Sequence, residues 1–257
     1  MALEERTFSS VAELLRLLPN VHKRSKTVWF RGQADHSWNL EPSLSRLGKL
    51  NTELQLIKQF KQNAHQFLER SSPLTEYDWI FLMQHYGVPT RLLDWTENPL
   101  IGLYFAVESD PKKKGKKKPP AALWCLYPRK LNEISGLILS PPDDIPAFGD
   151  DSELDDYLPS RIHGAGIARK NPAAISASRK FSRVYAQEGV FTILHRDTIR
   201  IDELTGAKGN QGHLVKLRIP RGSVPKLRAE LRLLGVNKLT VFPQLENVAE
   251  KIIKGMS

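Results

Sequence analysis

Apolar residues at helical spacing predict four helices in the first half of the chain. Ser10 and Glu13 form a capping box ahead of the first helix, and Pro19 predicts its end. Asn98 predicts the N-cap of the fourth helix, because a proline suited to the first helical position follows it. The apolar stripes of the second, third and fourth helices cover residues 51–70, about 75–86 and 99–108.

Short apolar or alternating runs predict strands, most of them in the second half. The run KTVWF predicts the first strand, with Val28 and Phe30 on one face and Arg31 on the other. Further strands are predicted at residues 90–96, 121–127, 188–194, 213–220 and 238–243. Two further helices are predicted at residues 226–235 and 244–253.

This order of elements predicts an α+β fold, in which a helical N-terminal half packs on a mixed or antiparallel sheet. The sequence of 257 residues shows no internal repeat, and we expect one domain over residues 1–257. Residues 139–178 are rich in Pro, Gly, Asp and Ser, so we expect an irregular acidic excursion there.

The net charge of +10 points towards nucleic acid, but it is concentrated in one run. The stretch PKKKGKKKPP at residues 111–120 holds six lysines, without which the net charge is +4. One interpretation is a solvated loop, and the other is contact with phosphates of DNA or RNA. In the second case the contacts come from Lys112, Lys113, Lys114, Lys116, Lys117 and Lys118.

Several classes of protein are disfavoured by what the sequence contains. No apolar run reaches the roughly 18 residues that a membrane span requires. The charged start MALEERTFSS lacks the apolar region of a signal peptide, so we expect a cytoplasmic protein. The single cysteine, Cys125, cannot form a disulfide within the chain or a cysteine-based zinc site, and we expect a buried core thiol.

Candidate site residues stand where apolar elements end. Polar side chains at such positions are held rigidly by the scaffold, as binding and catalytic sites require. Four stretches have this character: FRGQ at 30–33, QHYGVPTRLLDWT at 84–96, NP at 98–99 and YAQEGVF at 185–191.

The second of these stretches is the densest. In an extended segment Asp94 and Thr96 project together near the N-terminus of the helix that starts at Pro99, which suits an anion. Structural alternatives remain open: Arg91 pairs with Asp94, either Asp94 or Thr96 caps the helix, and His85 is a hydrogen-bonded core residue. The polar side chains of this stretch are Gln84, His85, Tyr86, Arg91, Asp94 and Thr96.

Three blocks of the sequence resemble the FRG domain, a bacterial and phage-associated family named after a Phe-Arg-Gly motif. They are WFRGQADHSWNLEPSLSR, MQHYGVPTRLLDWTENPLIGLYFAV and AQEGVF. The family has long been described as a domain of unknown function. Its presence near phage genes implies a role as a toxin or in phage defence.

A second resemblance is to the arginine-type mono-ADP-ribosyltransferases, which carry three motifs in sequence. WFRG is similar to their aromatic-Arg-Gly strand end, and DWTENPLIGLYFA to their Ser/Thr strand followed by a helix. AQEGVFTIL is similar to their third motif, although Gly189 stands where a second acidic residue is expected. The resemblance implies NAD as the substrate and a split sheet.

The resemblance assigns catalytic roles to three residues. Breaking the nicotinamide–ribose bond passes through a cation-like sugar, which the carboxylate of Glu188 would stabilise. Arg31 would hold the pyrophosphate or ribose of NAD, and His85 would deprotonate the acceptor. The structural alternatives are a surface position for Glu188 and a strand-end ion pair for Arg31.

Binding of NAD involves a larger set of residues under the same resemblance. Tyr86 or Trp95 would stack on nicotinamide, and Gln187 would orient the acceptor. The residues expected to bind NAD are Arg31, Gln33, Tyr86, Arg91, Asp94, Thr96 and Gln187.

Three functions therefore follow from the sequence. The first is ADP-ribosyl transfer to a macromolecule, with a nucleic-acid base as one acceptor, and the second is a non-catalytic module that binds nucleic acid or a nucleotide. The third is a metal-dependent nuclease, whereas the first two require no metal. A GxGxxG or P-loop motif is absent, which disfavours Rossmann-type NAD binding and NTPase chemistry. The nuclease would use Asp35, His36, His85 and Asp94.

Overall fold

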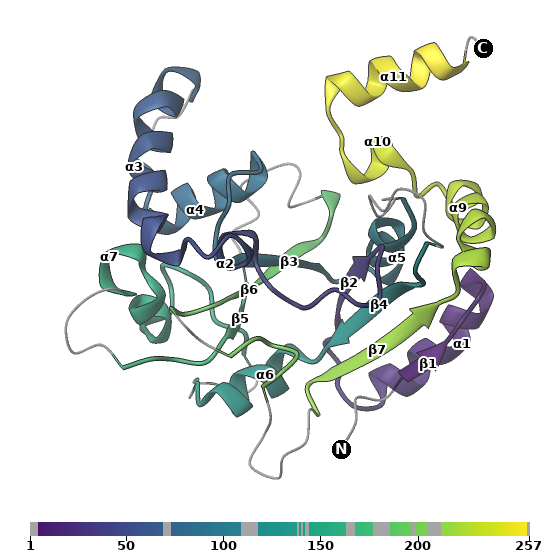
Figure 1. Ribbon diagram of the computed structural model, residues 1–257, viewed down its shortest axis with the longest axis horizontal. Coiled ribbons are helices and arrows are strands. Elements are labelled where there is room, and N and C mark those ends of the chain that lie inside the picture. The colour runs from purple at the N-terminus through teal and green to yellow at the C-terminus, as the bar shows by residue number, and fades with distance from the viewer. Residues whose placement is uncertain are drawn as a thin grey trace.

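A seven-stranded mixed sheet with helices on both sides organises the chain in the computed structural model (Figure 1). The strand order is β1-β7-β4-β2-β3-β6-β5, in which β1 runs parallel to β7 and the other neighbours are antiparallel. The structure describes residues 5–68, 73–108, 118–137, 139, 141, 144–162, 168–176, 186–196, 199–204 and 212–255.

The α+β class and the mixed sheet predicted from the sequence are confirmed. The strands are β1 Glu5–Thr7, β2 Trp29–Gln33, β3 Leu92–Thr96, β4 Ala121–Leu126, β5 Ala173–Ile175, β6 Gly189–Ile193 and β7 Leu214–Ile219. The helices are α1 Val11–His22, α2 Ser43–Arg46, α3 Glu53–Ala64, α4 Glu76–His85, α5 Pro99–Glu108, α6 Pro128–Ser135, α7 Pro159–Ile162, α9 Val224–Leu233, α10 Lys238–Val241 and α11 Leu245–Gly255. Short 3-10 turns are η1 Leu50–Thr52, η2 His65–Phe67, η3 Ser152–Tyr157 and η4 Arg221–Ser223.

The joint between β2 and β3 is the weakest in the sheet. In the described residues the two strands share a single registered pair, Phe30 with Thr96, whereas β2 pairs with β4, and β3 with β6, over five residues each. The ladder between β2 and β3 is therefore interrupted, and this place is called here the open joint.

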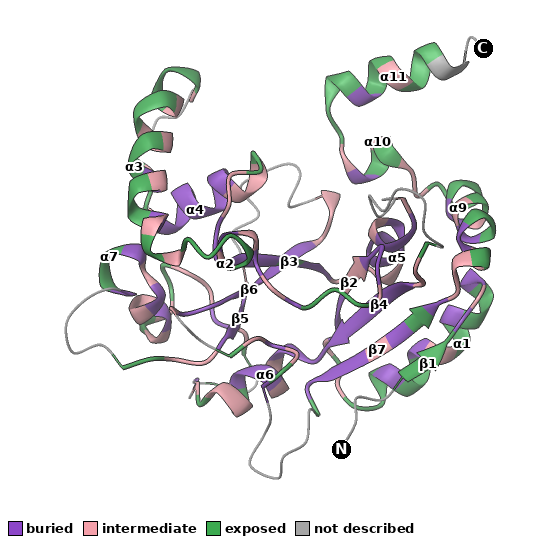
Figure 2. Cartoon of the chain, viewed as in Figure 1, coloured by how far each residue is buried: buried purple, intermediate pink, exposed green. Residues whose placement is uncertain are grey.

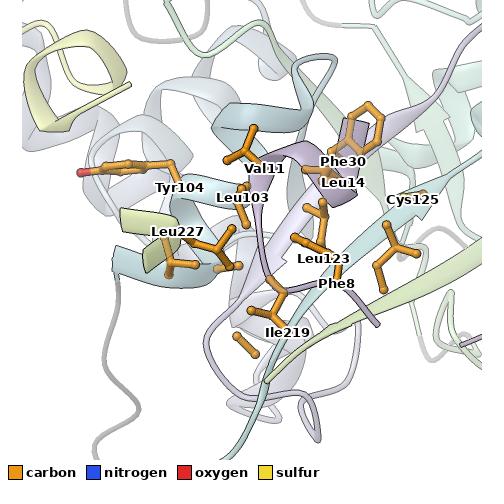
Figure 3. Packing of buried hydrophobic residues seen from close by; sticks show 14 of the residues in the cluster. Phe8, Val11, Leu14, Phe30, Leu103, Tyr104, Leu123, Cys125, Ile219 and Leu227 are labelled. Carbon is orange, nitrogen blue, oxygen red and sulfur yellow. The ribbon is translucent and has the colours of Figure 1, made fainter. Parts of the chain in front are cut away.

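Alternation along β2 divides the core between the two faces of the sheet. Val28 and Phe30 join the cluster under α1, α5 and α9, and Trp29 joins a cluster on the opposite face, as the sequence predicted. Figure 3 shows Phe30 and Cys125 within the first of these clusters. Cys125 is fully buried, which confirms its assignment as a core thiol.

Helix α5 lies directly on β2 because two glycines allow backbone to approach backbone. A Cβ atom on Gly32 would lie 2.1 Å from the carbonyl oxygen of Gly102 and 2.3 Å from the amide nitrogen of Ala106. A Cβ on Gly102 would lie 2.8 Å from the Cβ of Phe30. This contact holds the middle of α5 against β2, beside the open joint.

Two of the predicted elements differ from the structure. Helix α1 continues through Pro19 to His22, because Leu18 and Val21 are buried in the core and outweigh the hydrogen bond that proline cannot donate. The strand predicted at 238–243 is wrong: residues 238–241 form α10. The side chain of Asn237 accepts hydrogen bonds from the N–H groups of Leu239 and Thr240, and this cap overrides the β propensity of the apolar run.

The segment expected to be an irregular excursion contributes to the fold. Its described part contains η3, α7 and the edge strand β5, and Leu154 and Tyr157 of η3 are buried. The described part of this segment therefore contains only short regular elements, and it contributes to the core. In the part of the chain that the structure describes, no helix is both long and apolar enough to cross a membrane. Figure 2 shows that the inner strands of the sheet are largely buried, while the edge strand β1 and the helices α3 and α11 are largely exposed.

Candidate functional site

A pocket of about 270 Å³ lies at the open joint between β2 and β3. Strands β2, β3 and β6 and helices α4 and α5 contribute its walls. The lining residues are Phe30, Arg31, Gly32, Phe81, Gln84, His85, Asp94, Trp95, Thr96, Phe105, Gln187, Gly189 and Phe191.

Arg31 brings a positive charge into this pocket. Its Nη1 donates a hydrogen bond of 2.6 Å to the backbone oxygen of Asp94, across the joint. Its Nε is buried and has no hydrogen-bond partner among the described residues. Burial lowers the pKa of Arg31, while the Asp94 carboxylate raises it, and an arginine stays charged in proteins. The guanidinium is therefore a charged group in the pocket wall, held there by its bond to Asp94.

The wall opposite is set by a chain of side-chain hydrogen bonds. Gln84 donates from Nε2 to Oδ2 of Asp94 at 2.7 Å, and Thr90 donates from Oγ1 to Oε1 of Gln84 at 2.5 Å. These bonds fix which way the Gln84 amide faces and join the end of α4 to β3. His85, the last residue of α4, lines the pocket beside them.

Thr96 connects β3 to the segment that precedes β6. Its Oγ1 donates to the backbone oxygen of Gln187 at 2.6 Å and accepts from the N–H of Asn98 at 3.0 Å. The N–H of Glu97 donates to the backbone oxygen of Glu188 at 3.1 Å. These contacts hold Glu188 in the left-handed region, with φ at 45°, where a residue with a side chain is strained.

Asn98 holds the side chain of Glu188. Its Oδ1 caps α5 by accepting from the N–H groups of Leu100 at 2.9 Å and Ile101 at 3.4 Å. Its Nδ2 donates to Oε1 of Glu188 at 3.0 Å. The cap therefore dictates that the amide nitrogen faces the carboxylate. The sequence predicted Asn98 as an N-cap but not its contact with Glu188. The only sequence signal for that contact was that the capping residue has an amide side chain.

Aromatic side chains supply most of the apolar wall. Trp95 is fixed by a hydrogen bond of 3.0 Å from its Nε1 to Oγ1 of Thr192, and Phe105 packs edge to face on Phe242. Gln187 donates from Nε2 to the backbone oxygen of Val241 at 3.1 Å, which ties the pocket to α10. Flat apolar walls with a few polar groups are typical of small-molecule sites.

Residues 26–115 match the family model of the FRG domain. The chain contains an FRG domain. This match includes β2, α4, β3 and α5, so four of the five elements that form the pocket lie within it. The residues before and within β6 lie outside it. No curated protein and no solved structure matched the chain.

Arg91 of the FRG domain has a structural position. Its side chain is buried and pairs with Glu53 at 2.7 Å from Nε. Nη1 donates to the backbone oxygen of Leu194 and Nη2 to that of Tyr157, both at 2.7 Å. Arg91 is not among the residues that line the pocket, so its position does not support NAD binding. The alternative in which it pairs with Asp94 is wrong, because its ion pair is with Glu53. Its partner Glu53 is distant in sequence, which is why the pairing was not predicted.

Gln33 and Tyr86 also lie within the FRG match and do not line the pocket. The buried Gln33 donates to the backbone oxygen of Asn39 at 3.0 Å and accepts from Nε1 of Trp124 at 2.7 Å. Tyr86 is 64% exposed and meets His85 edge to face, with 4.8 Å between ring centres. The expected contact of these two residues with NAD is therefore not supported by their positions.

The lysine run falls almost wholly outside the described residues. Lys118 is exposed just before β4. The other residues proposed to contact nucleic acid, Lys112, Lys113, Lys114, Lys116 and Lys117, lie outside the described part of the chain.

The residues of the nuclease hypothesis do not form one cluster. His85 and Asp94 line the pocket. Asp35 is buried and accepts from the N–H and Oγ of Ser37, while His36 contacts Glu5 at 2.9 Å. Within the described ranges, no group of three or more His, Cys, Asp or Glu is placed to hold a metal ion.

Proposed function

We propose that this pocket binds NAD and that the protein transfers ADP-ribose to a macromolecule with release of nicotinamide. The supporting observation is that three segments far apart in the chain meet at one pocket. They are the end of β2 with Arg31, the end of β3 with Thr96, and residues 187–189.

The pocket suits the reactive end of NAD. Its volume of about 270 Å³ lies near the lower limit of small-molecule sites, which are roughly 300–1,000 Å³, so it fits nicotinamide with its ribose rather than the whole dinucleotide. Phe and Trp side chains offer flat surfaces to an aromatic ring. The guanidinium of Arg31, which lines the pocket, would donate charged hydrogen bonds to a ribose or phosphate oxygen.

Glu188 would stabilise the charge that develops on the sugar. When the bond from C1′ to the nicotinamide nitrogen breaks, its electron pair leaves with neutral nicotinamide and positive charge spreads over the ribose ring. The acceptor then forms a bond to C1′ and loses a proton. A carboxylate fixed beforehand stabilises such a cation without reorganisation. Glu188 stands between two lining residues, and Asn98 anchors its carboxylate.

His85 is the group best placed to take the acceptor's proton. It lines the pocket at the end of α4, next to the exposed Tyr86. An imidazole is effective as a base near neutral pH. Asp94 and Gln84, joined by a hydrogen bond, lie on the same wall and would orient the entering group.

The test follows both products. The protein is incubated with NAD labelled in its adenosine part, together with DNA, RNA or a cell extract, and released nicotinamide and labelled macromolecule are measured. We expect both, and we expect Glu188→Gln to lower both rates by about 100-fold or more. A wild-type protein that releases no nicotinamide and labels nothing contradicts the proposal, and so does a Glu188→Gln protein that matches it.

Binding without chemistry is the second candidate function. The Glu188 carboxylate already accepts a bond from Asn98 and is not among the lining groups, so the pocket could hold a nucleotide without turnover. This alternative predicts saturable NAD binding and no nicotinamide release in the same experiment.

We place the reaction in the cytoplasm, in a toxin or phage-defence setting. A transferase that modifies host macromolecules would slow growth when it is expressed. Expression of the Arg31→Ala protein at the same level should relieve that effect. Equal growth inhibition by both proteins would contradict this setting.

A further inference from the structure

The surface formed by residues 42–68 carries no exposed carboxylate. It covers α2, η1, α3 and η2 and is called here the α2–α3 surface. Its only acidic residue, Glu53, is buried in the pair with Arg91. Arg46, Lys49 and Lys58 are exposed, so the charged side chains that residues 42–68 expose are all basic. Glu41, just before this surface, is half-buried and accepts a hydrogen bond from Oγ of Ser45.

One face of α3, continued into η2, is built of amides and lysine. Its members recur at helical spacing and are all exposed: Gln55, Lys58, Gln59, Gln62, Asn63 and Gln66. Solvated helices usually mix the two signs of charge. In this protein α9 does so with Lys226 and Glu230, and α11 with Glu250 and Lys251. The lack of exposed acids on α3 is therefore a property of that helix.

The α2–α3 surface adjoins the pocket. Phe60 of α3 packs against Tyr86 with 6.5 Å between ring centres, and Tyr86 meets His85, which lines the pocket. Arg46 is close enough to Arg31 to contribute to the lowering of its pKa. In Figure 1 α3 stands beside α4 and away from α1 and α9. Figure 2 shows its outer sides exposed.

We propose that the α2–α3 surface binds single-stranded nucleic acid and presents a base to the pocket as the acceptor of ADP-ribose. The acceptor role rests on the proposed transferase function. Lysine and arginine neutralise phosphates, and glutamine and asparagine hydrogen-bond to base edges. Tyr86 and Phe67, 64% and 78% exposed, offer rings on which bases stack. A base inside a duplex cannot enter a pocket of this kind, which favours a single strand.

The reaction balances with a base nitrogen as the nucleophile. That nitrogen forms a bond to C1′ while the bond from C1′ to nicotinamide breaks, and the pair from the broken bond leaves on nicotinamide. The proton from the base passes to His85 and then to water. No oxidant, reductant or metal is required.

The test measures binding without NAD. Fluorescence anisotropy is recorded with labelled single-stranded DNA, single-stranded RNA and a duplex of the same sequence, over a range of salt. We expect tighter binding of a single strand, and we expect Lys58→Glu to weaken it by about tenfold and to reduce the salt slope by about one. Lys226→Glu on α9 is the matched control and should change affinity less than about twofold.

The outcomes distinguish a failure of the proposed binding surface from a failure of the proposed transferase function. Equal effects of Lys58→Glu and Lys226→Glu would overturn the proposed surface, as would binding that depends only on the lysine run at 112–118. A duplex bound as tightly as the single strand would also overturn it. Binding that depends on Lys58, without any transfer from NAD, would support the surface and contradict the transferase. If ADP-ribose is transferred to nucleic acid at the same rate by the wild-type and Lys58→Glu proteins, the result would support the transferase and contradict the surface.

Discussion

Asn98 joins two tasks in one side chain. Its carbonyl oxygen caps α5, and its amide nitrogen holds the carboxylate of Glu188. Because an amide has distinct donor and acceptor ends, the first bond orients the second. The backbone of Glu188 is strained, with φ at 45°, and a strained residue keeps its conformation only where its neighbours hold it.

The two tasks can be separated by Asn98→Asp. Aspartate caps helices as well as asparagine does, so the free energy of unfolding should change by less than about 1 kcal/mol. The new carboxylate repels Glu188, so kcat for nicotinamide release should fall by about 100-fold with little change in the KM for NAD. Asn237→Asp, at the cap of α10, is the matched control. A wild-type kcat in Asn98→Asp would show that Asn98 only caps the helix.

The sequence predicted single residues well where a local pattern determined them. Alternation placed Arg31 opposite Phe30, and Thr96 reached the predicted position near the start of α5. The sequence did not predict the role of Arg91, because its partner Glu53 is brought near it only by the fold. An arginine that binds a ligand and one that joins two elements look alike in a linear motif.

At the scale of elements, the contact between β2 and α5 positions the pocket. We predict that Gly32→Ala lowers the free energy of unfolding by about 3 kcal/mol, because its Cβ would meet backbone at 2.1 Å and one element must move. Urea denaturation measures this change. Gly222→Ala is the control, since nothing lies within 4 Å of its Cβ, and should change stability by less than about 0.5 kcal/mol. Equal stability of the two variants would contradict the close packing.

Elements were predictable where periodicity and caps agreed. Helices α4, α5 and α9 and strands β3, β4, β6 and β7 lie where the pattern predicted them. Helix α1 passes Pro19 because tertiary burial is stronger than a local break, and α10 replaces a strand because of a cap. The three-residue strands β1 and β5 are too short for a periodic signal.

At the scale of the whole molecule, Arg91 joins several segments. It links β3 to α3, to η3 and to the end of β6. We predict that Arg91→Met costs about 3–5 kcal/mol in urea denaturation, because Glu53 would remain buried without its partner charge. Arg161→Met removes an exposed arginine that lies 3.5 Å from Asp155 and should cost at most about 1 kcal/mol. Similar losses in both variants would contradict a special role for Arg91.

Buried histidine makes the stability of the whole fold depend on pH. His195 is fully buried, and burial, helped by the charge of Arg91, lowers its pKa to about 4. The unfolded state takes up a proton near pH 6.5, so stability should be full above that pH and fall by about 3 kcal/mol as pH drops towards 4. His195→Gln should flatten this part of the profile. An unchanged slope would show that other groups cause it; His213, whose pKa burial also lowers, is the next to test.

The class of the fold was predictable, but its sheet order was not. Helices first and strands later indicate α+β, whereas the pairing of β1 with β7 brings the first strand of the described chain beside the last one. The opening between β2 and β3 is a consequence of that three-dimensional arrangement. The candidate site depends on it, because the opening brings Arg31 and Gln187 to one pocket.

The most direct test of the central claim is a crystal structure of the protein with a non-hydrolysable NAD analogue. The account predicts the nicotinamide ribose in the pocket between β2 and β3, with a ribose or phosphate oxygen bound by Arg31 and the C1′ atom facing Glu188. An analogue bound elsewhere on the molecule, with Arg31 still bonded only to Asp94, would contradict it.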